Sequence, residues 1–529
     1  MKDGFYSEII NGILVGRVRG KQDLHREKIR LCRKYNIKGV PPDSEIIKHL
    51  PDYLSSEEKE LLLSVLRKKP VRTLSGVTVV AVMTSPADCP HGRCVPCPGG
   101  TSRNTPQSYT GFEPAAMRAI MHGFDPFEQT RSRVEQLRAV GHPVDKVDFI
   151  VMGGTFTARN PFYQEWFIKR CFDGLNGFSS RNLVEAQRKN ESAESRCIGL
   201  TIETRPDWFR VQHVDNALRF GCTRVELGVQ TTYDVLLYKM KRGHTVTDTV
   251  LATKLAKDAG LKVCYHMMPG LPGSTLDMDL ESFRTVFEDQ RFKPDMLKIY
   301  PTLVVKGTEL YEMWKKGEYE PLSTEKAISL IASVKAFVPE WVRIQRIERD
   351  VPSTHIDAGV KASNLRQLVQ REMKKQGKQC RCIRCREIGH SGFSNGFKEE
   401  DIVLVRRQYA ASDGVEVFLS LEDRGFNVVF GYLRLRLPAS PHRWELQRES
   451  CMVVRELKVV GREVPLGEST EVGVQHRGFG RELLEEAERI CREEFDCKRL
   501  FVLSGIGVKE YYRGLGFKDD GVYLSKSVQ

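Results

Sequence analysis

The stretch VTVVAVMTSPADCPHGRCVPCPGG, residues 77–100, decides the fold, because it joins a strand to a loop of three cysteines. The β-branched run 77–83 predicts the strand. Cys89, Cys94 and Cys97 follow it, separated by four and two residues. Three thiolates spaced in this way suit three corners of a four-iron cluster and leave one iron open to an external ligand. A structural zinc loop with a distant fourth ligand is the alternative, and the spacing alone does not decide.

Beyond this loop, short apolar runs alternate with helical patterns up to about residue 350. Such alternation predicts parallel strands with right-handed crossovers. We therefore expect an α/β fold over residues 76–350, an open, partial (β/α)6 TIM-like barrel with its chemistry at the carboxyl ends of the strands. The residues that directly follow strand runs there are Gly153, Gly154, Thr155, Glu203 and Gln230.

Composition limits the class of protein. The chain has 529 residues and is 40% hydrophobic, which predicts two or three globular domains and excludes overall disorder. It has no long uncharged apolar run and no signal-peptide pattern, so we expect a soluble cytoplasmic protein that does not span a membrane. Six of the fourteen cysteines fall in two clusters typical of metal ligands, and the other eight are scattered.

The first 75 residues are predicted to be helical and basic. Residues 1–40 carry a net charge of +6, which is typical of a surface that binds a polyanion. The alternative is a helix face that is charged only because it is exposed to solvent. The basic residues expected to contact a polyanion, which the family resemblance described below implies is tRNA, are Arg17, Arg19, Lys21, Arg26, Lys28, Arg30, Arg33 and Lys34.

Residues 351–400 are predicted to form a linker that carries the second cysteine cluster. Cys380, Cys382 and Cys385, with His390 five residues on, suit a tetrahedral structural zinc site. Surface thiols without a metal are the alternative, and a residue other than His390 could supply the fourth ligand.

Residues 401–529 are predicted to form a separate domain, which contains a second series of strands and a long helix near 478–495. Gln475-x-x-Gly478-x-Gly480 matches the Q/R-x-x-G-x-G/A turn of GCN5-related acetyltransferases (GNAT), in which a helix amino terminus cradles a pyrophosphate. The expected acetyl-CoA contacts are Glu456, Leu457, Lys458 and Val459 on the preceding strand, and Val474, Gln475, His476, Arg477, Gly478 and Gly480 at the turn. Of Tyr511 and Tyr512, we expect one to act as a proton donor to the thioester sulfur and the other to pack, with Tyr512 slightly favoured.

The three-cysteine loop followed by Gly153-Gly154-Thr155 resembles the radical S-adenosylmethionine (SAM) superfamily, although the usual first spacing there is three residues. The longer segments TIETRPD, GCTRVELGVQ, HMMPGLPG and LKIYPTLV resemble the family of catalytic subunits of the Elongator complex, in which the wider spacing is normal. This resemblance covers about residues 70–525 and suggests an archaeal-type single chain.

The resemblance implies an enzyme with a [4Fe-4S] cluster that cleaves SAM to a 5′-deoxyadenosyl radical. Gly153, Gly154 and Thr155 would contact the methionine end of SAM, and Glu203 and Gln230 the rest, unless these two only cap the barrel mouth. The radical would activate the acetyl methyl group of acetyl-CoA for addition to carbon-5 of uridine 34, giving 5-carboxymethyluridine in the tRNA anticodon loop. An electron donor is implied, as is a homodimer or a larger Elongator-like assembly.

Two other functions fit parts of the sequence. The first is a protein lysine acetyltransferase of the histone type, with a structural iron–sulfur domain. The second is a non-catalytic tRNA-binding scaffold. Dependence of tRNA modification on both SAM and the three cysteines would exclude the first, and turnover itself would exclude the second.

Overall fold

The computed structural model describes residues 2–68, 73, 75–389, 399–425, 427–461 and 478–529. None of the described helices is long and apolar enough to cross a membrane.

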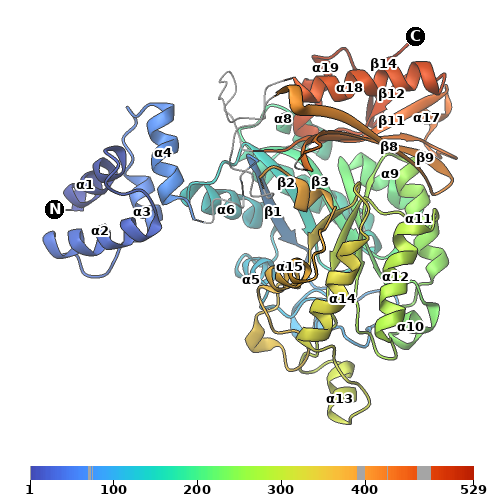
Figure 1. Cartoon of the computed structure of the whole chain (residues 1–529), viewed down its shortest axis with the longest axis horizontal. Helices are drawn as coiled ribbons and strands as arrows, with labels where there is room; N and C mark the ends of the chain where they lie inside the picture. The colour runs from blue at the N-terminus through green and yellow to red at the C-terminus, as the bar shows by residue number, and fades with distance from the viewer. Residues whose placement is uncertain (1, 69–72, 74, 390–398, 426, 462–477) are drawn as a thin grey trace.

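Four helices form a small amino-terminal lobe beside the rest of the chain (Figure 1). The lobe has its own core, in which Phe5, Ile9 and Leu62 are fully buried. The last helix begins with the expected capping box, in which Ser55 and Glu58 each bind the other's backbone N–H. The helices are α1 (Lys2–Leu14), α2 (Lys21–Lys34), α3 (Asp43–Lys48) and α4 (Ser56–Leu66).

A parallel sheet with its strands in sequence order forms the central domain, as the alternation predicts. The six expected strands are present, and a seventh short strand that the sequence analysis did not identify closes the series. An open half-barrel of seven strands results: β1 (Val77–Met83), β2 (Lys146–Met152), β3 (Arg196–Thr204), β4 (Cys222–Gln230), β5 (Lys262–Met267), β6 (Met296–Ile299) and β7 (Arg343–Arg346).

Helices cover the outer face of this sheet, and their apolar sides complete one continuous core. The main ones are α6 (Pro126–Ala139), α7 (Pro161–Asn176), α9 (Val211–Arg219), α11 (Val246–Asp258), α12 (Leu276–Glu288) and α14 (Thr324–Ala336).

The expected linker is partly built into the half-barrel. Helix α15 (Leu365–Lys375) buries Leu365, Val369 and Met373 in the core of the half-barrel. The adjoining Cys382 is also fully buried there. Residues 351–385 are therefore structurally continuous with the half-barrel.

The C-terminal domain is a mixed sheet in the order β13-β14-β12-β11-β10-β9-β8. Helix α18 (Phe479–Arg489) packs on it through Leu483, Leu484 and Ala487. The strands are β8 (Ile402–Ala411), β9 (Gly414–Asp423), β10 (Val428–Leu437), β11 (Cys451–Val459), β12 (Arg499–Val502), β13 (Lys518–Asp520) and β14 (Tyr523–Ser527), and the helix α19 (Lys509–Arg513) precedes β13.

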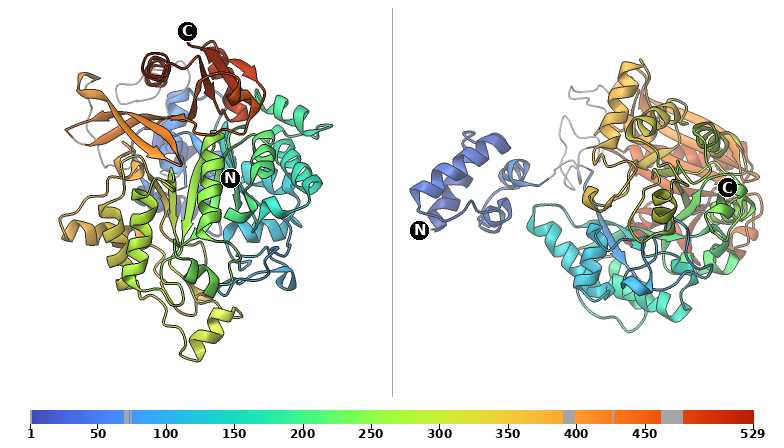
Figure 2. Two further views of the ribbon diagram at one scale, coloured as in Figure 1. Left: turned by 90° about the vertical axis from the view of Figure 1, so that its right-hand side faces the viewer. Right: turned by 90° about the horizontal axis from the view of Figure 1, so that it is seen from below.

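This second sheet covers the amino ends of the barrel strands (Figure 2). A Cβ at Gly505 would lie 2.1 Å from the Ile198 carbonyl oxygen on β3, so only glycine permits the approach. Buried ion pairs also cross the interface, with Arg455 of β11 bonded to Asp295 at 2.5 Å and Arg436 of β10 bonded to Asp258 at 2.5 Å. The two domains are thus joined by a desolvated, charged interface.

Candidate functional site

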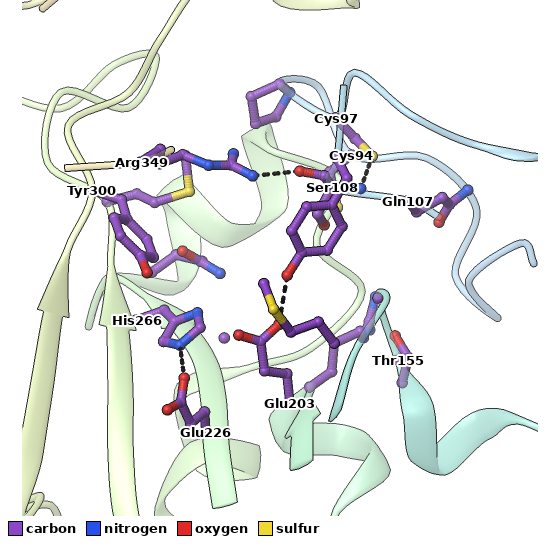
Figure 3. A pocket seen from close by; sticks show the side chains of 18 of the residues that line it. Cys94, Cys97, Gln107, Ser108, Thr155, Glu203, Glu226, His266, Tyr300 and Arg349 are labelled. Carbon is purple, nitrogen blue, oxygen red and sulfur yellow. Dashed lines mark hydrogen bonds and ion pairs between the residues drawn. The ribbon is translucent and has the colours of Figure 1, made fainter. Parts of the chain in front are cut away.

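The three cysteines of the first loop line a cavity that opens to solvent at the carboxyl ends of the barrel strands (Figure 3). Cys94 and Cys97 are buried, and Cys89 is partly buried. Of the residues lining this cavity, these three are the only cysteines. A set of three thiols around an open cavity fits a [4Fe-4S] cluster with one iron free for SAM.

Each of the three sulfurs has a neighbour that can donate a hydrogen bond. The Ser108 backbone N–H donates to Cys97 Sγ over 3.2 Å, and Thr155 Oγ1 lies 3.4 Å from Cys89 Sγ. Cys94 Sγ has two neighbours that the sequence analysis missed, Arg242 Nη1 at 3.4 Å and His91 Nε2 at 3.0 Å. Burial raises the pKa of the Cys89 and Cys97 thiols, so these donors and a bound metal are needed to favour the thiolates.

The glycine-rich turn after β2 lies beside the cysteine loop. Gly153 and Gly154 have φ values of 129° and 84°, and a Cβ on Gly154 would lie 3.8 Å from Cys89 Sγ. Gly154 therefore presents backbone without a side chain toward the cysteine loop, which suits close approach by an amino acid such as the methionine part of SAM. Gly153 does not line the cavity, and a Cβ there would lie 2.1 Å from Thr84 Oγ1, so this glycine permits close packing against the end of β1.

Glu203 and Gln230 lie at the ends of β3 and β4 and line the same cavity. Tyr109 donates a hydrogen bond of 2.6 Å to Glu203 Oε2, and Lys298 Nζ lies 3.6 Å from Oε1. Gln230 holds a positive φ of 73°, which is uncommon for a side chain of its size. The structure thus brings Gly154, Thr155, Glu203 and Gln230 together with the three cysteines.

The cavity floor is polar, a feature that the sequence analysis did not identify. Glu226 on β4, His266 on β5 and Lys298 on β6 meet there, and Glu226 is fully buried. The signal was available, since each of these residues is a charged or titratable residue inside an otherwise apolar strand.

The second cysteine cluster is compact. The sulfurs of Cys380, Cys382 and Cys385 lie within 4.8 Å of one another, whereas the three cysteines of the first loop form no such tight group. The close spacing of Cys380, Cys382 and Cys385 fits ligands of a single metal ion, whereas the wider spacing of the first-loop cysteines fits ligands of a cluster of several irons. His390 lies outside the described residues.

The expected acetyl-CoA strand is β11. It pairs with β12 only from Cys451 to Val454, although β11 continues beside β10 to Val459. The backbone of Glu456 to Val459 therefore has no β12 partner on that edge. Gly478 precedes α18 with a φ of 84°, and Gly480 lies in its first turn, whereas Val474, Gln475, His476 and Arg477 lie outside the described residues.

The two adjacent tyrosines of α19 occupy different environments. A Cβ at Gly480 would lie 2.8 Å from the Tyr511 hydroxyl, so this phenol lies at the start of α18. Tyr511 is 45% exposed, whereas Tyr512 is 7% exposed and packs in the domain core against Phe517. The geometry favours Tyr511, contrary to the preference stated from the sequence.

The basic run of the amino-terminal lobe is only partly available to a ligand. Lys28 is buried and donates a 2.8 Å hydrogen bond to Asp43, so its proposed role in tRNA binding is not supported. Lys21 bonds the other oxygen of Asp43, and Arg30 pairs with Glu27. Lys34 pairs with Glu8. The remaining residues Arg17, Arg19, Arg26 and Arg33 are exposed, although Arg26 lies 3.5 Å from Asp23.

Three family models match this chain. They are the ELP3 N-terminal domain over residues 3–74, the Radical SAM superfamily over 84–286 and the Radical_SAM C-terminal domain over 294–375. The last match agrees with the packing of α15 on the half-barrel.

Relatives similar to the whole chain are known. A "tRNA uridine(34) acetyltransferase" of Methanocaldococcus jannaschii is 52% identical over 97% of this chain and 95% of its own length. The "Elongator complex protein 3" of Drosophila melanogaster is 45% identical over 99% of this chain and 96% of its own. The solved structure of an archaeal Methanocaldococcus infernus Elp3 lacking residues 1–46 is 49% identical, with a TM-score of 0.76, covering 85% of this chain and 99% of that one.

Proposed function

This chain belongs to the Elp3 family of radical SAM tRNA uridine(34) acetyltransferases, and from this premise we propose that it converts uridine 34 to 5-carboxymethyluridine. The donor of the two-carbon unit is acetyl-CoA, and the substrate region is the tRNA anticodon loop, whose unstacked bases can enter a pocket. An external electron donor is required, and a homodimer or a larger Elongator-like assembly is compatible with this activity.

The barrel cavity supplies the radical half of the reaction. Cys89, Cys94 and Cys97 would hold the cluster, and the turn at Gly153 and Gly154 would admit the methionine end of SAM. When bound, the reduced cluster supplies the electron that cleaves SAM. Glu203, held by Tyr109 and Lys298, is placed to bind polar groups of the cofactor or the base.

The C-terminal domain supplies the acetyl half. The unpaired edge of β11 from Glu456 to Val459 offers backbone groups to the pantetheine amides, and the amino terminus of α18 offers N–H groups to the pyrophosphate. Tyr511, whose hydroxyl lies at the start of α18, would donate the proton to the thioester sulfur.

A single observation carries this proposal. The cavity that gathers the three cysteines also gathers the glycine turn and a polar floor, at the carboxyl ends of strands whose amino ends are covered by the C-terminal sheet. The proposed radical site and the proposed acetyl-CoA fold are therefore joined through a buried interface.

The test is anaerobic incubation of the chain with tRNA, SAM, a reductant and acetyl-CoA, followed by mass spectrometry of the tRNA nucleosides. We expect 5-carboxymethyluridine only when all four components are present. Acetylated histone peptide without modified uridine would instead identify a lysine acetyltransferase. Tight tRNA binding without turnover of any substrate would identify a scaffold.

We expect the exposed arginines of the amino-terminal lobe to bind tRNA phosphates. Changing Arg17, Arg26 and Arg33 to Glu should weaken tRNA binding about tenfold or more at physiological salt and flatten its salt dependence, because released counterions contribute to affinity. Affinity measured over a salt series, by fluorescence anisotropy, checks this.

The matched control changes three exposed basic residues of the barrel, Arg181, Arg188 and Lys189, to Glu. These lie in or beside α8 (Leu183–Asn190), so the net charge changes equally without touching the lobe. Equal losses of affinity in the two variants would contradict a specific role for the lobe.

We also propose structural zinc at Cys380, Cys382 and Cys385, with His390 as the fourth ligand. The close sulfurs and the burial of Cys382 support this proposal. Replacing Cys380 and Cys385 with Ser should remove one equivalent of zinc and lower the Tm by about 5 °C or more, because structural zinc contributes several kcal/mol. Elemental analysis and calorimetry measure these effects, with Cys171→Ala as the control for loss of a buried thiol. Unchanged zinc content would contradict the site.

A further inference from the structure

A histidine–carboxylate pair lies on the floor of the barrel cavity, away from the cluster cysteines. His266 Nε2 lies 2.7 Å from Glu226 Oε2, and the side chain of His266 is 15% exposed, whereas that of Glu226 is fully buried. Figure 3 shows His266 between Glu226 and the open part of the cavity. The ring therefore has one nitrogen on a buried carboxylate and one toward the space where a substrate would bind.

The surrounding charges keep Glu226 ionised. Burial alone would raise its pKa, but Lys298 and His266 oppose burial and hold the pKa of Glu226 below its usual range. Arg224 Nε also lies 3.4 Å from Glu226 Oε1. The other polar groups around His266 are Tyr300, whose ring centroid is 5.4 Å from that of His266, and Glu203, which is bound by Tyr109.

An ionised carboxylate can only accept hydrogen bonds. Nε2 of neutral His266 must then carry the ring hydrogen, and Nδ1 presents a lone pair. No described residue forms a hydrogen bond with Nδ1 of His266, whose only side-chain hydrogen bond is the one between Nε2 and Glu226. This is the arrangement of a general base oriented by a carboxylate.

A metal site is the competing use of these residues, since Cys264 joins Glu226 and His266 within 4.8 Å. Against a metal, Lys298 and Arg224 already neutralise the carboxylate, and burial raises the pKa of the Cys264 thiol well above its usual value. A cation would have to displace an ammonium group from a fully buried carboxylate, which is unfavourable.

We propose that His266 is the base that removes the hydrogen from carbon-5 of uridine 34 after the new carbon–carbon bond has formed there. This inference rests on the proposed function. Addition of the carbon radical to carbon-5 leaves an unpaired electron on carbon-6, and the oxidised iron–sulfur cluster would accept that electron, so that SAM is the net two-electron oxidant. The hydrogen on carbon-5 of the resulting cationic adduct then leaves as a proton to Nδ1 of His266. The electron pair of the broken C–H bond restores the double bond between carbon-5 and carbon-6. Glu226 is a positioning residue that fixes the tautomer of His266 and stabilises the imidazolium.

The experiment uses the full chain with its cluster and tRNA carrying either hydrogen or deuterium at carbon-5 of uridine 34. His266→Ala should lower the rate of product formation at least about a hundredfold, the usual contribution of a general base. Cleavage of SAM should stay within about threefold of wild type, because radical generation does not need this proton transfer. Glu226→Gln should retain partial activity and show a larger deuterium isotope effect than wild type.

His442→Ala is the matched control. His442 Nε2 lies 3.0 Å from Asp215 Oδ1, so the variant also breaks a histidine–carboxylate pair, but one that does not line the cavity. It should leave both rates unchanged. If His266→Ala lowers the Tm, His266→Gln replaces it in the experiment, because glutamine fills more of the space of the imidazole but cannot act as the base.

A second readout needs no cofactor. The ¹⁵N spectrum of the histidine rings should assign an Nε2–H tautomer to His266 in the wild-type chain and a mixed state in Glu226→Gln. Full product formation by His266→Ala, or loss of SAM cleavage together with product, would overturn the inference. If wild-type chain itself makes no modified uridine, the proposed function has failed rather than the assignment of the base.

Discussion

Cys94→Ser is expected to eliminate SAM cleavage and to reduce uridine modification to background. In the proposed site Cys94 would supply one of three thiolates, and its sulfur lies beside both Arg242 and His91. Serine is a poor ligand for iron, so the cluster would lose a corner and the site would no longer hold it stably. Iron content, the visible spectrum of the reconstituted chain and the yield of 5′-deoxyadenosine measure the effect.

Acetyl-CoA binding should survive this substitution, since the C-terminal sheet lies at the opposite ends of the barrel strands. Titration calorimetry with acetyl-CoA separates a local loss from general unfolding. Cys171→Ala, a buried cysteine on α7 away from the cavity, should retain both the cluster and activity. A Cys94→Ser chain with a full iron complement would disprove the assignment of the ligand.

Arg455→Met should destabilise the chain by about 3 kcal/mol or more, the second-largest effect that we expect. Arg455 is fully buried and bonds Asp295 of the barrel at 2.5 Å and Glu416 of its own sheet at 2.9 Å. Its removal leaves two buried carboxylates with fewer partners. The resulting loss in the free energy of unfolding exceeds the amount that the ion pairs themselves contributed. Denaturant unfolding monitored by both circular dichroism and tryptophan fluorescence gives the change in the free energy of unfolding.

Arg499→Met is the appropriate comparison. Arg499 also makes two ion pairs, with Glu449 and Asp520, but its side chain is 37% exposed and solvent screens the charges. We expect a loss of about 1 kcal/mol or less there. Similar losses for the two variants would show that burial of the interdomain network has no special energetic importance.

Several features were predictable from the sequence because neighbouring residues encode them. The run 77–83 forms β1, and the cysteines and glycine turn that follow strands lie at one end of the barrel. The strand Arg343–Arg346 was missed because it is short and carries two arginines, so its apolar alternation is too brief to recognise. The burial of Lys28 against Asp43 could not be predicted, because a charge pattern does not reveal a partner from another helix.

By itself, the sequence determined the strand order of the half-barrel, the cysteine loop that follows its first strand and the helix that follows Gly478. Each depends on local spacing, which hydrophobic periodicity and ligand geometry make readable. Only the tertiary structure paired His266 with Glu226 and Arg455 with Asp295, and placed Tyr511 rather than Tyr512 beside Gly480. Those contacts depend on strand register, helix rotation and domain docking, which bring together residues up to 160 positions apart. Local patterns carry no information about such distant neighbours.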